Sequence, residues 1–164
     1  TGRRALALGM KVDYYDPIRQ PRLEAEWGVD YRPLDELLTQ ADYLSLHLPL
    51  TNETATILDA AAFAKVKKGV YVINCGRGGT IDEDALYEAL VAGKVAGAAL
   101  DVFETEPLPA GHALWRLPNV LLSPHCADNV PGWVDEAMRV FLRQLERFRR
   151  GEPLQDVVDK ANGY

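Results

Sequence analysis

The sequence contains only two cysteines, Cys75 and Cys126, among its 164 residues. A disulfide framework is therefore not what holds the fold together, and reduced thiols in an intracellular protein are the simpler expectation. The CxxC spacing that zinc sites use is absent as well. We accordingly expect no metal site.

Long apolar runs are also lacking, since none approaches the roughly 18 to 20 residues that cross a bilayer. The first ten residues do not have the layout of a secretory signal. These absences predict a cytoplasmic protein without a membrane partner. An excess of basic residues is missing too: 18 Lys and Arg stand against 24 Asp and Glu, giving a net charge of −6. That balance argues against a nucleic-acid partner.

A starting methionine is the last absence, because the chain opens with Thr1 in what looks like the end of a helix. This beginning suggests a fragment, a processed product or a segment cut from a larger protein. What is present is the material of one ordinary globular domain: 48% of the residues are hydrophobic and 26% are charged.

Short apolar segments alternate with helical patterns along the chain, which is typical of βαβ units that build a parallel sheet. The predicted fold is α/β, a doubly wound parallel sheet with helices on both faces, because strands such as VYVIN and VAGAAL are apolar throughout. The predicted strands are Lys11 to Tyr15, Val29 to Tyr31, Tyr43 to Leu48, Val70 to Asn74, Val95 to Leu100 and Val120 to Leu122.

Helix boundaries are readable from capping residues. Asp59 and Asp82 are expected to cap helices, while Gly69 and Gly93 are expected to end them. A last helix is predicted from about Pro131 to Arg150. Its apolar stripe indicates packing against the body of the protein rather than a membrane or a coiled coil. The stripe consists of Val134, Met138, Phe141, Leu145 and Phe148.

Four strands end in residues that can carry chemistry, and the carboxyl ends of parallel strands lie on one edge of a sheet. Asp16 could hold ribose hydroxyls and disfavour a 2′-phosphate, although Asp before Pro is also a common turn former. Arg77, in a glycine-rich loop, could grip a carboxylate through two hydrogen bonds, or be an ordinary surface arginine.

The two remaining strand ends carry carboxylates and an imidazole. Asp101, Glu104 and Glu106 follow one strand, and His125 follows the next. A histidine can move a proton near neutral pH, and a neighbouring carboxylate would orient its ring and stabilise the imidazolium. A lone loop histidine is more often inert, so the prediction depends on these groups meeting at one edge.

At this point the chain resembles a known family, the D-isomer-specific 2-hydroxyacid dehydrogenases. The resemblance covers about Lys11 to the end, in the family's order and approximate spacing. It is carried by HLPLTNETATIL, VINCGRGGTIDEDALYEAL, AGAALDVFETEPLP and LLSPHCADN.

The resemblance implies an oxidoreductase that transfers a hydride between NAD and a small 2-oxo or 2-hydroxy acid, as a homodimer. It assigns Arg77 to the substrate, His125 to proton transfer and Glu106 to pairing with His125. Glu104 matches no catalytic position. The residues it places around the cofactor are Asp16, Leu48, Pro49, Thr54, Cys75, Gly76 and Asp101.

The family's first strand and its G-x-G-x-x-G turn are not found before Lys11. We therefore expect a Rossmann-like sheet truncated at its N-terminus, with residues 1–130 as a partial NAD-binding domain. Residues 131–164 are expected to be a helix and tail that return towards an absent substrate domain. Without the first strand, the strands at Lys11 and Tyr43 should not pair, and the chain alone should bind NAD poorly.

Two other functions remain open from the sequence. Some relatives use the same nucleotide fold as an NAD-sensing scaffold for transcriptional corepression. Others share these motifs but act on phosphoglycerate or phosphite. The complete Arg, Glu and His set favours an enzyme, and glyoxylate or hydroxypyruvate is the expected kind of substrate.

Overall fold

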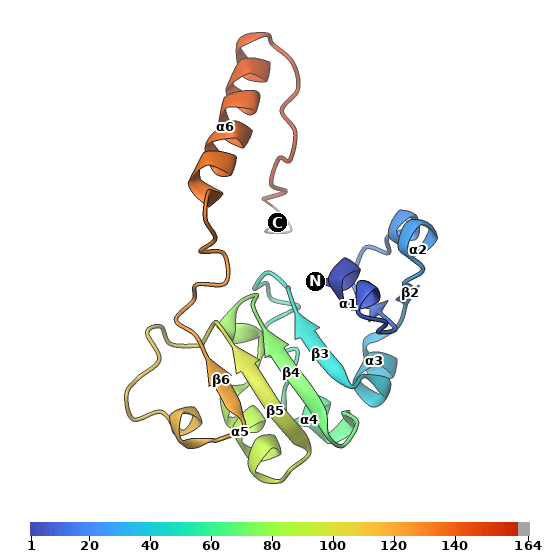
Figure 1. The fold of residues 1–164 in the computed structure, drawn as a ribbon, viewed down its shortest axis with the longest axis vertical. Helices are drawn as coiled ribbons and strands as arrows, with labels where there is room; N and C mark the ends of the chain where they lie inside the picture. Colours follow the sequence, from blue (N-terminus) through green and yellow to red (C-terminus); the bar gives the residue numbers. More distant parts are fainter. Residues whose placement is uncertain (161–164) are drawn as a thin grey trace.

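The computed structural model describes residues 1–160 and is built around a four-stranded parallel sheet (Figure 1). The predicted bounds of the last three strands are confirmed, while the first ends two residues earlier than predicted. The strands, in spatial order, are β3 (Tyr43–Leu46), β4 (Val70–Asn74), β5 (Val95–Leu100) and β6 (Val120–Leu122).

The core lies between this sheet and three helices on one of its faces. Val70, Val72 and Val95 are fully buried and project from β4 and β5 towards the helices. Each such side chain stabilises the fold by roughly 1.5–3 kcal/mol. The helices are α3 (Leu34–Gln40), α4 (Ala60–Lys65) and α5 (Glu83–Val91).

The predicted helix boundaries are confirmed at Asp59, Asp82 and Gly93, but the prediction that Gly69 ends a helix was wrong, because α4 ends at Lys65. Asp59 accepts a hydrogen bond from the Ala62 N–H at the start of α4, and Asp82 accepts one from the Ala85 N–H at the start of α5. Gly93 follows α5 with a φ of 67°, the left-handed conformation that ends helices.

The second face of the sheet is open in residues 1–160, so the prediction of helices on both faces was wrong for this part of the chain. Tyr43, Tyr71 and Leu121 point away from the core and are 52%, 44% and 74% exposed. The rings of Tyr43 and Tyr71 stack with their centroids 5.3 Å apart. Apolar residues on both sides of a strand indicate that both sides need cover, but they do not say which element supplies it.

A smaller lobe at the N-terminal end has its own two-stranded parallel sheet. The prediction that the strand at Lys11 does not pair with the strand at Tyr43 is therefore confirmed. Helix α2 was not predicted, although Pro21 at its start and Gly28, in the left-handed conformation at its end, are its signals. The lobe consists of α1 (Gly2–Ala7), β1 (Asp13–Tyr14), α2 (Pro21–Trp27) and β2 (Asp30–Tyr31).

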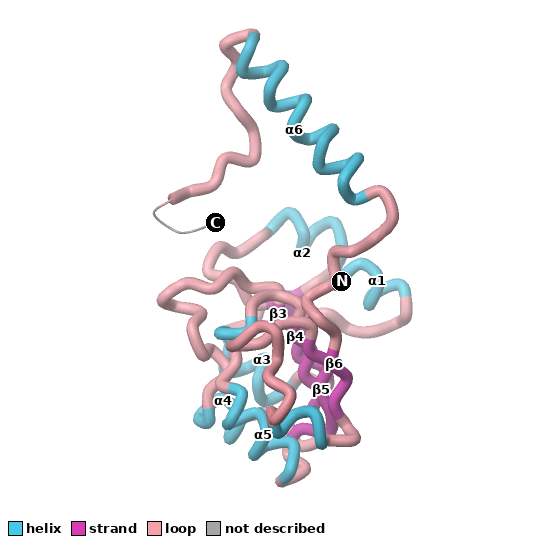
Figure 2. Tube along the Cα trace, turned by 90° about the vertical axis from the view of Figure 1, so that its left-hand side faces the viewer, coloured by secondary structure: helices cyan, strands magenta, loops and turns pink. Residues whose placement is uncertain are grey.

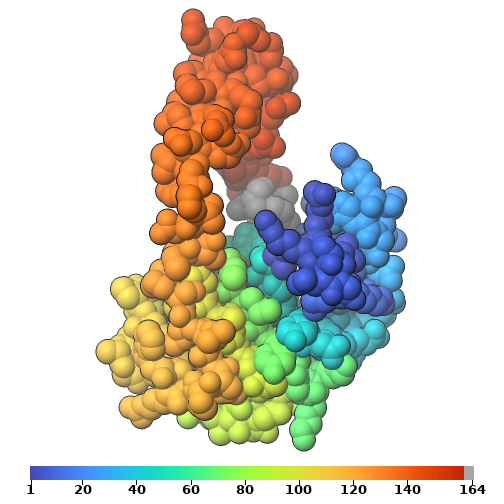
Figure 3. All heavy atoms as spheres, in the orientation of Figure 1, coloured from blue at the N-terminus to red at the C-terminus, as the bar shows by residue number. Residues whose placement is uncertain are grey.

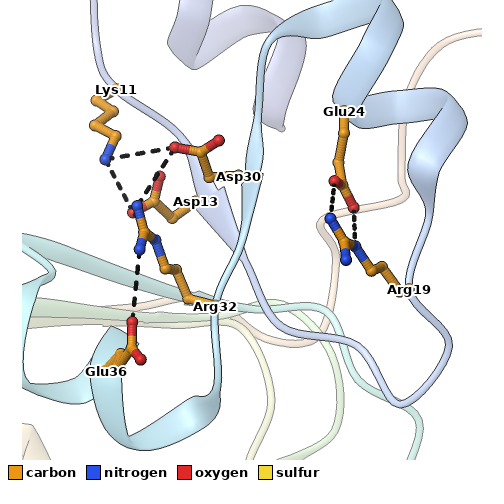
Figure 4. A network of polar contacts seen from close by, with 7 residues as sticks. All are labelled: Lys11, Asp13, Arg19, Glu24, Asp30, Arg32 and Glu36. Atoms are coloured by element: carbon orange, nitrogen blue, oxygen red, sulfur yellow. Dashed lines mark hydrogen bonds and ion pairs between the residues drawn. The ribbon is translucent and has the colours of Figure 1, made fainter.

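A chain of ion pairs joins this lobe to α3 (Figure 4). Lys11 lies 3.4 Å from Asp13 and 3.7 Å from Asp30, and Arg32 lies 3.5 Å from Asp13 and 3.6 Å from Glu36. Ion pairs of an exposed side chain such as Lys11, which is 68% exposed, each contribute only about 0–1 kcal/mol. The network therefore orients the lobe more than it stabilises it.

Helix α6 (Trp133–Arg149) stands away from the body as a column, and the following residues run back along it (Figures 1 to 3). None of its residues is buried, and the apolar stripe, including Met138, Phe141 and Phe148, is exposed. The prediction that this helix packs against the body was wrong. An amphipathic pattern shows that a face needs a partner, but not which surface provides it. Within residues 1–160, no helix is long and apolar enough to cross a membrane.

Candidate active site

The loops that follow β4, β5 and β6 meet beyond the carboxyl ends of these strands, where open α/β sheets bind ligands. A pocket of about 290 Å³ opens between them. Its lining combines strand residues with polar groups from all three loops, among them Cys75, Asp101, Ser123 and Cys126.

The loop that carries Arg77 is shaped by Asn74, which is almost completely buried at the end of β4. The Asn74 amide donates to the Arg77 carbonyl at 3.1 Å and to the Thr80 hydroxyl at 3.2 Å, and its oxygen accepts the Gly76 N–H at 3.0 Å. Gly76 must be small, because a Cβ there would lie 2.8 Å from the Leu48 carbonyl oxygen. The backbone is thus fixed while the Arg77 side chain is exposed at the sheet edge.

Glu106 and His125 are hydrogen-bonded to each other, with 2.7 Å between Oε2 and Nδ1. The other Glu106 oxygen accepts the Phe103 N–H at 3.0 Å. The bond from His125 is the largest of several influences that lower the pKa of Glu106, and the positive charge of Arg77 lowers it further. The carboxylate therefore stays ionised and is within electrostatic reach of both other predicted catalytic groups.

The Nδ1 contact determines what the His125 ring can do. With Nδ1 held by Glu106, Nε2 is the ring nitrogen left to exchange a proton with a ligand. The His125 side chain is 45% exposed and Glu106 is 35% exposed, so a ligand can reach the pair. The backbone of His125 lies in the left-handed region, with a φ of 50°.

Asp101 fixes the loop after β6 from the end of β5. One of its oxygens accepts the Ser123 hydroxyl at 2.5 Å and the Cys126 N–H at 2.9 Å, while the other accepts the Ala127 N–H at 2.8 Å. Burial acts to raise the pKa of Asp101, but these hydrogen bonds outweigh it, and the pKa lies below its ordinary value. Asp101 therefore holds the segment that carries His125 and also lines the pocket.

Asp101→Asn is expected to destabilise the protein by about 2 kcal/mol or more at pH 7, because the amide cannot accept all the hydrogen bonds that the carboxylate accepts. The native pKa lies below the ordinary value of 3.8. The carboxylate's contribution is therefore present above that pH and is lost as the pH falls through the native pKa. Urea unfolding of both proteins at pH 7 and pH 3 checks this, and an equal difference at both pH values would contradict it.

Gly78 lets the arginine loop pack directly on the loop after β5. A Cβ at Gly78 would lie 1.9 Å from the Phe103 carbonyl carbon. Gly78→Ala is therefore expected to destabilise the protein by about 3 kcal/mol, the upper part of the usual range for overpacking. Gly111→Ala is the matched control, because a Cβ there meets no atom within 4 Å. Equal urea midpoints for the two variants would refute the close approach.

The predicted cofactor residues nearer the N-terminus lie in two loops. Thr54 is buried, and its hydroxyl donates to the Pro49 carbonyl at 2.6 Å, closing the loop after β3 in which Leu48 also lies. Asp16 lies in the small lobe, where one of its oxygens accepts the Ile18 N–H at 2.8 Å. That bond fits the turn interpretation of Asp16. The contacts of all four residues with a cofactor stay predictions.

The arginine that follows Asp16 in the chain is already engaged (Figure 4). Arg19 donates to both oxygens of Glu24, at 2.8 and 2.7 Å, and this pairing holds the pKa of Glu24 at about 2. The Tyr14 hydroxyl donates to the same carboxylate at 2.8 Å.

Sequence reasoning missed three supporting residues: Asn74, Glu83 and Ser123. Asn74 had a signal, since a polar residue at the end of an otherwise apolar strand needs buried partners. Ser123, next to the predicted histidine loop, could have been suspected as well. Glu83 had none, because its partners lie more than twenty residues away in the chain.

This arrangement defines a class of protein. A parallel α/β sheet with a pocket at its carboxyl edge, and with a cation and a carboxylate–imidazole pair in the loops at that edge, is typical of nucleotide-dependent oxidoreductases. Residues 1–127 match the model of the D-isomer specific 2-hydroxyacid dehydrogenase family, NAD binding domain. The chain belongs to this family, and the predicted fold class, an α/β Rossmann-like fold with a parallel sheet and flanking helices, is confirmed.

Three relatives illustrate the similarity. The chain is 40% identical to a glyoxylate reductase of Korarchaeum cryptofilum, over 96% of this chain and 48% of the relative. It is 43% identical to a D-3-phosphoglycerate dehydrogenase of Bacillus subtilis, over 96% of this chain and 30% of the relative. The NADPH-dependent glyoxylate/hydroxypyruvate reductase of Sinorhizobium meliloti, solved with NADP and sulfate, superposes with a TM-score of 0.90 at 37% identity, over 99% of this chain and 52% of that one. The chain thus spans about half the length of some of its relatives, and less of others.

The pocket fits one end of a nicotinamide cofactor. Four apolar strand residues, Ala99, Leu100, Leu121 and Leu122, line it, and the carboxylate of Asp101 and the hydroxyl of Ser123 provide polar groups, a combination suited to a planar ring that carries an amide. Cys75 lines this pocket, and the contacts of Cys75 and Gly76 with a cofactor stay predictions. Within residues 1–160, no group of three or more His, Cys, Asp or Glu side chains could hold a metal ion.

Proposed function

We propose that this chain supplies the cofactor-binding and proton-transferring part of an oxidoreductase that reduces a small 2-oxo acid, such as glyoxylate or hydroxypyruvate, with NADH. The observation that carries the proposal is the 2.7 Å pair of Glu106 and His125 at the sheet edge where Arg77 also lies. Relatives named for glyoxylate and hydroxypyruvate reduction support the substrate class.

Each side chain has a role that follows from its chemistry. The Arg77 guanidinium would bind the carboxylate of the acid and polarise the neighbouring carbonyl. His125 would donate a proton from Nε2 to the carbonyl oxygen in reduction and take it back in oxidation. Glu106, bonded to Nδ1, would hold the ring in place and stabilise its protonated form. A bound nicotinamide supplies the hydride.

The decisive assay is oxidation of NADH by the full-length enzyme with glyoxylate, hydroxypyruvate, phosphohydroxypyruvate and pyruvate. Turnover with at least one of them is expected. Folded protein that oxidises NADH with none would end the proposal. Preference for phosphohydroxypyruvate would support the phosphoglycerate alternative, which the Bacillus subtilis relative favours.

The same assay with NADPH tests the choice of cofactor. Asp16 favours NAD, because a carboxylate hydrogen-bonds ribose hydroxyls and repels a 2′-phosphate. The neighbouring Arg19 is neutralised by Glu24, which removes a cation that could otherwise attract that phosphate. A higher kcat/KM with NADPH than with NADH would contradict this preference.

Residues 131–164 are proposed to reach towards a substrate-binding domain, with residues 1–130 as the NAD-binding part. The exposed apolar stripe of α6 supports this, since such a stripe needs a partner surface. A homodimer in the cytoplasm is proposed for the full-length enzyme. Sedimentation of that protein tests the dimer, and a monomer at micromolar concentration would contradict it.

A further inference from the structure

Two consecutive backbone N–H groups in the loop after β5 are held by two different carboxylates. The Phe103 N–H donates to Glu106 at 3.0 Å, and the next N–H, that of Glu104, donates to Glu83 Oε1 at 2.8 Å. Glu83 lies in the first turn of α5, just after the loop that carries Arg77. The peptide between residues 103 and 104 therefore joins the arginine loop to the loop of Glu106.

The side chain of Glu83 is only 10% exposed, and each of its two carboxylate oxygens has a partner. Its second oxygen lies 3.3 Å from His112 Nε2. The Nδ1 atom of His112 accepts the Leu114 N–H at 3.4 Å, which leaves Nε2 to donate to Glu83. Burial raises the pKa of Glu83, partly offset by the Glu104 N–H and by His112. Such a buried carboxylate is unfavourable unless its partners compensate for it.

The same peptide is also held sterically. Gly78, next to Arg77, lies so close to the Phe103 carbonyl that no side chain would fit between them. The ring of Phe103 is buried in the core. Gly78 packs against the peptide between residues 103 and 104, and Glu83 accepts its N–H. Glu106 follows that peptide by two residues.

We propose that Glu83, supported by His112, is a positioning residue. It holds the loop after β5 in the position that lets Glu106 bond to His125. It also links that pair to the arginine loop. The catalytic consequence depends on the function proposed above. The alternative to this positioning role is a purely local one, in which Glu83 only stabilises the start of α5, as the exposed neighbour Asp84 does.

Amide hydrogen exchange tests the contact without any need for activity. In Glu83→Ala, the Glu104 N–H is expected to exchange at least tenfold faster, because it loses its acceptor. Glu83→Gln keeps a carbonyl oxygen in place and is expected to stay within about threefold of the wild type. Asp84→Ala is the matched control on the same helical turn and is expected to change nothing. Equal rates in Glu83→Ala and Asp84→Ala would overturn the proposal.

Kinetics of the full-length enzyme test the catalytic consequence. Glu83→Ala is expected to lower kcat about tenfold with the KM for NADH within about twofold, and Glu83→Gln to restore most of kcat. An unchanged kcat in Glu83→Ala would overturn the positioning role. Wild-type protein inactive with every 2-oxo acid would instead overturn the proposed function and leave the exchange result to decide the contact.

A folding defect in Glu83→Ala would not prevent the test. His112→Gln removes the supporting imidazole while Glu83 remains. Exchange of the Glu104 N–H is then expected to rise at least threefold, since the carboxylate loses the group that orients it. No change in the exchange rate of that variant would overturn the supporting role of His112, and an unchanged kcat in His112→Gln as well would overturn the proposal as a whole.

Discussion

Replacing His125 by asparagine is expected to lower kcat of the full-length enzyme by about 10²- to 10⁴-fold, the range usual for the loss of a general acid or base. Asparagine keeps a polar side chain of similar reach but cannot exchange a proton near neutral pH. The KM for NADH is expected to change less than twofold, because the cofactor is held largely by other residues. Steady-state rates with varied NADH and 2-oxo acid measure both quantities.

His47→Asn is the control for this variant, since His47 is exposed and bonded only locally, to Ser45 at 3.0 Å. Its kcat is expected to stay within about twofold of the wild type. Glu106→Gln should fall between the two, because the ring would keep a hydrogen-bond partner but lose the charge that stabilises the imidazolium. A His125→Asn enzyme with wild-type kcat would remove His125 from proton transfer.

Replacing Arg77 by glutamine is expected to lower kcat/KM for the 2-oxo acid by about 30- to 1000-fold. The figure corresponds to about 2–4 kcal/mol for the loss of one partner of a hydrogen-bonded charge pair. Arg77→Lys should recover only part of the loss, because an ammonium group cannot form two parallel bonds to a carboxylate. The effect should lie mainly in the KM of the acid and in kcat, with the KM for NADH nearly unchanged.

Arg116→Gln is the matched control, because Arg116 is an exposed arginine at the end of a short helical turn, Ala113–Arg116. Its kcat/KM is expected to match the wild type. If Arg77→Gln and Arg116→Gln behaved alike, the Arg77 guanidinium would have no special role in holding the acid.

Local signals in the sequence were sufficient to predict the strands of the four-stranded sheet and the starts of α4 and α5. Val70–Asn74 and Val95–Leu100 are buried apolar strands whose bounds follow from flanking glycines and charges. The caps at Asp59 and Asp82 depend on bonds only three residues long. Such short-range determinants can be read without knowing the rest of the fold.

The meeting of Glu106 and His125 could be predicted for a different reason. Both follow parallel strands, and neighbouring parallel strands bring their carboxyl ends to the same edge of the sheet. The topology therefore joins residues that are 19 positions apart. Arg77, after the next strand along, comes within electrostatic reach of Glu106 by the same rule.

Long-range packing could not be predicted. Two contacts depend on how the loops after β4 and β5 pack together: the hydrogen bond from the Glu104 N–H to Glu83, and the close approach of Gly78 to Phe103. The spacing of residues in the sequence does not indicate such packing. The apolar stripe of α6 was sufficient to predict the helix but not the surface on which it packs. Among residues 1–160 the stripe is exposed to solvent. The open face around Tyr43 and Tyr71 could not be predicted for the same reason, because an apolar strand does not show which element covers it.

The most direct measurement is a crystal structure of the full-length enzyme with NADH and oxamate, an unreactive analogue of a 2-oxo acid. Two of the Arg77 guanidinium nitrogens are expected at about 2.7–3.1 Å from the oxamate carboxylate. His125 Nε2 is expected within about 3.2 Å of the amide oxygen, with Nδ1 still bonded to Glu106. Oxamate bound elsewhere, or Arg77 and His125 turned to different ligands, would contradict it.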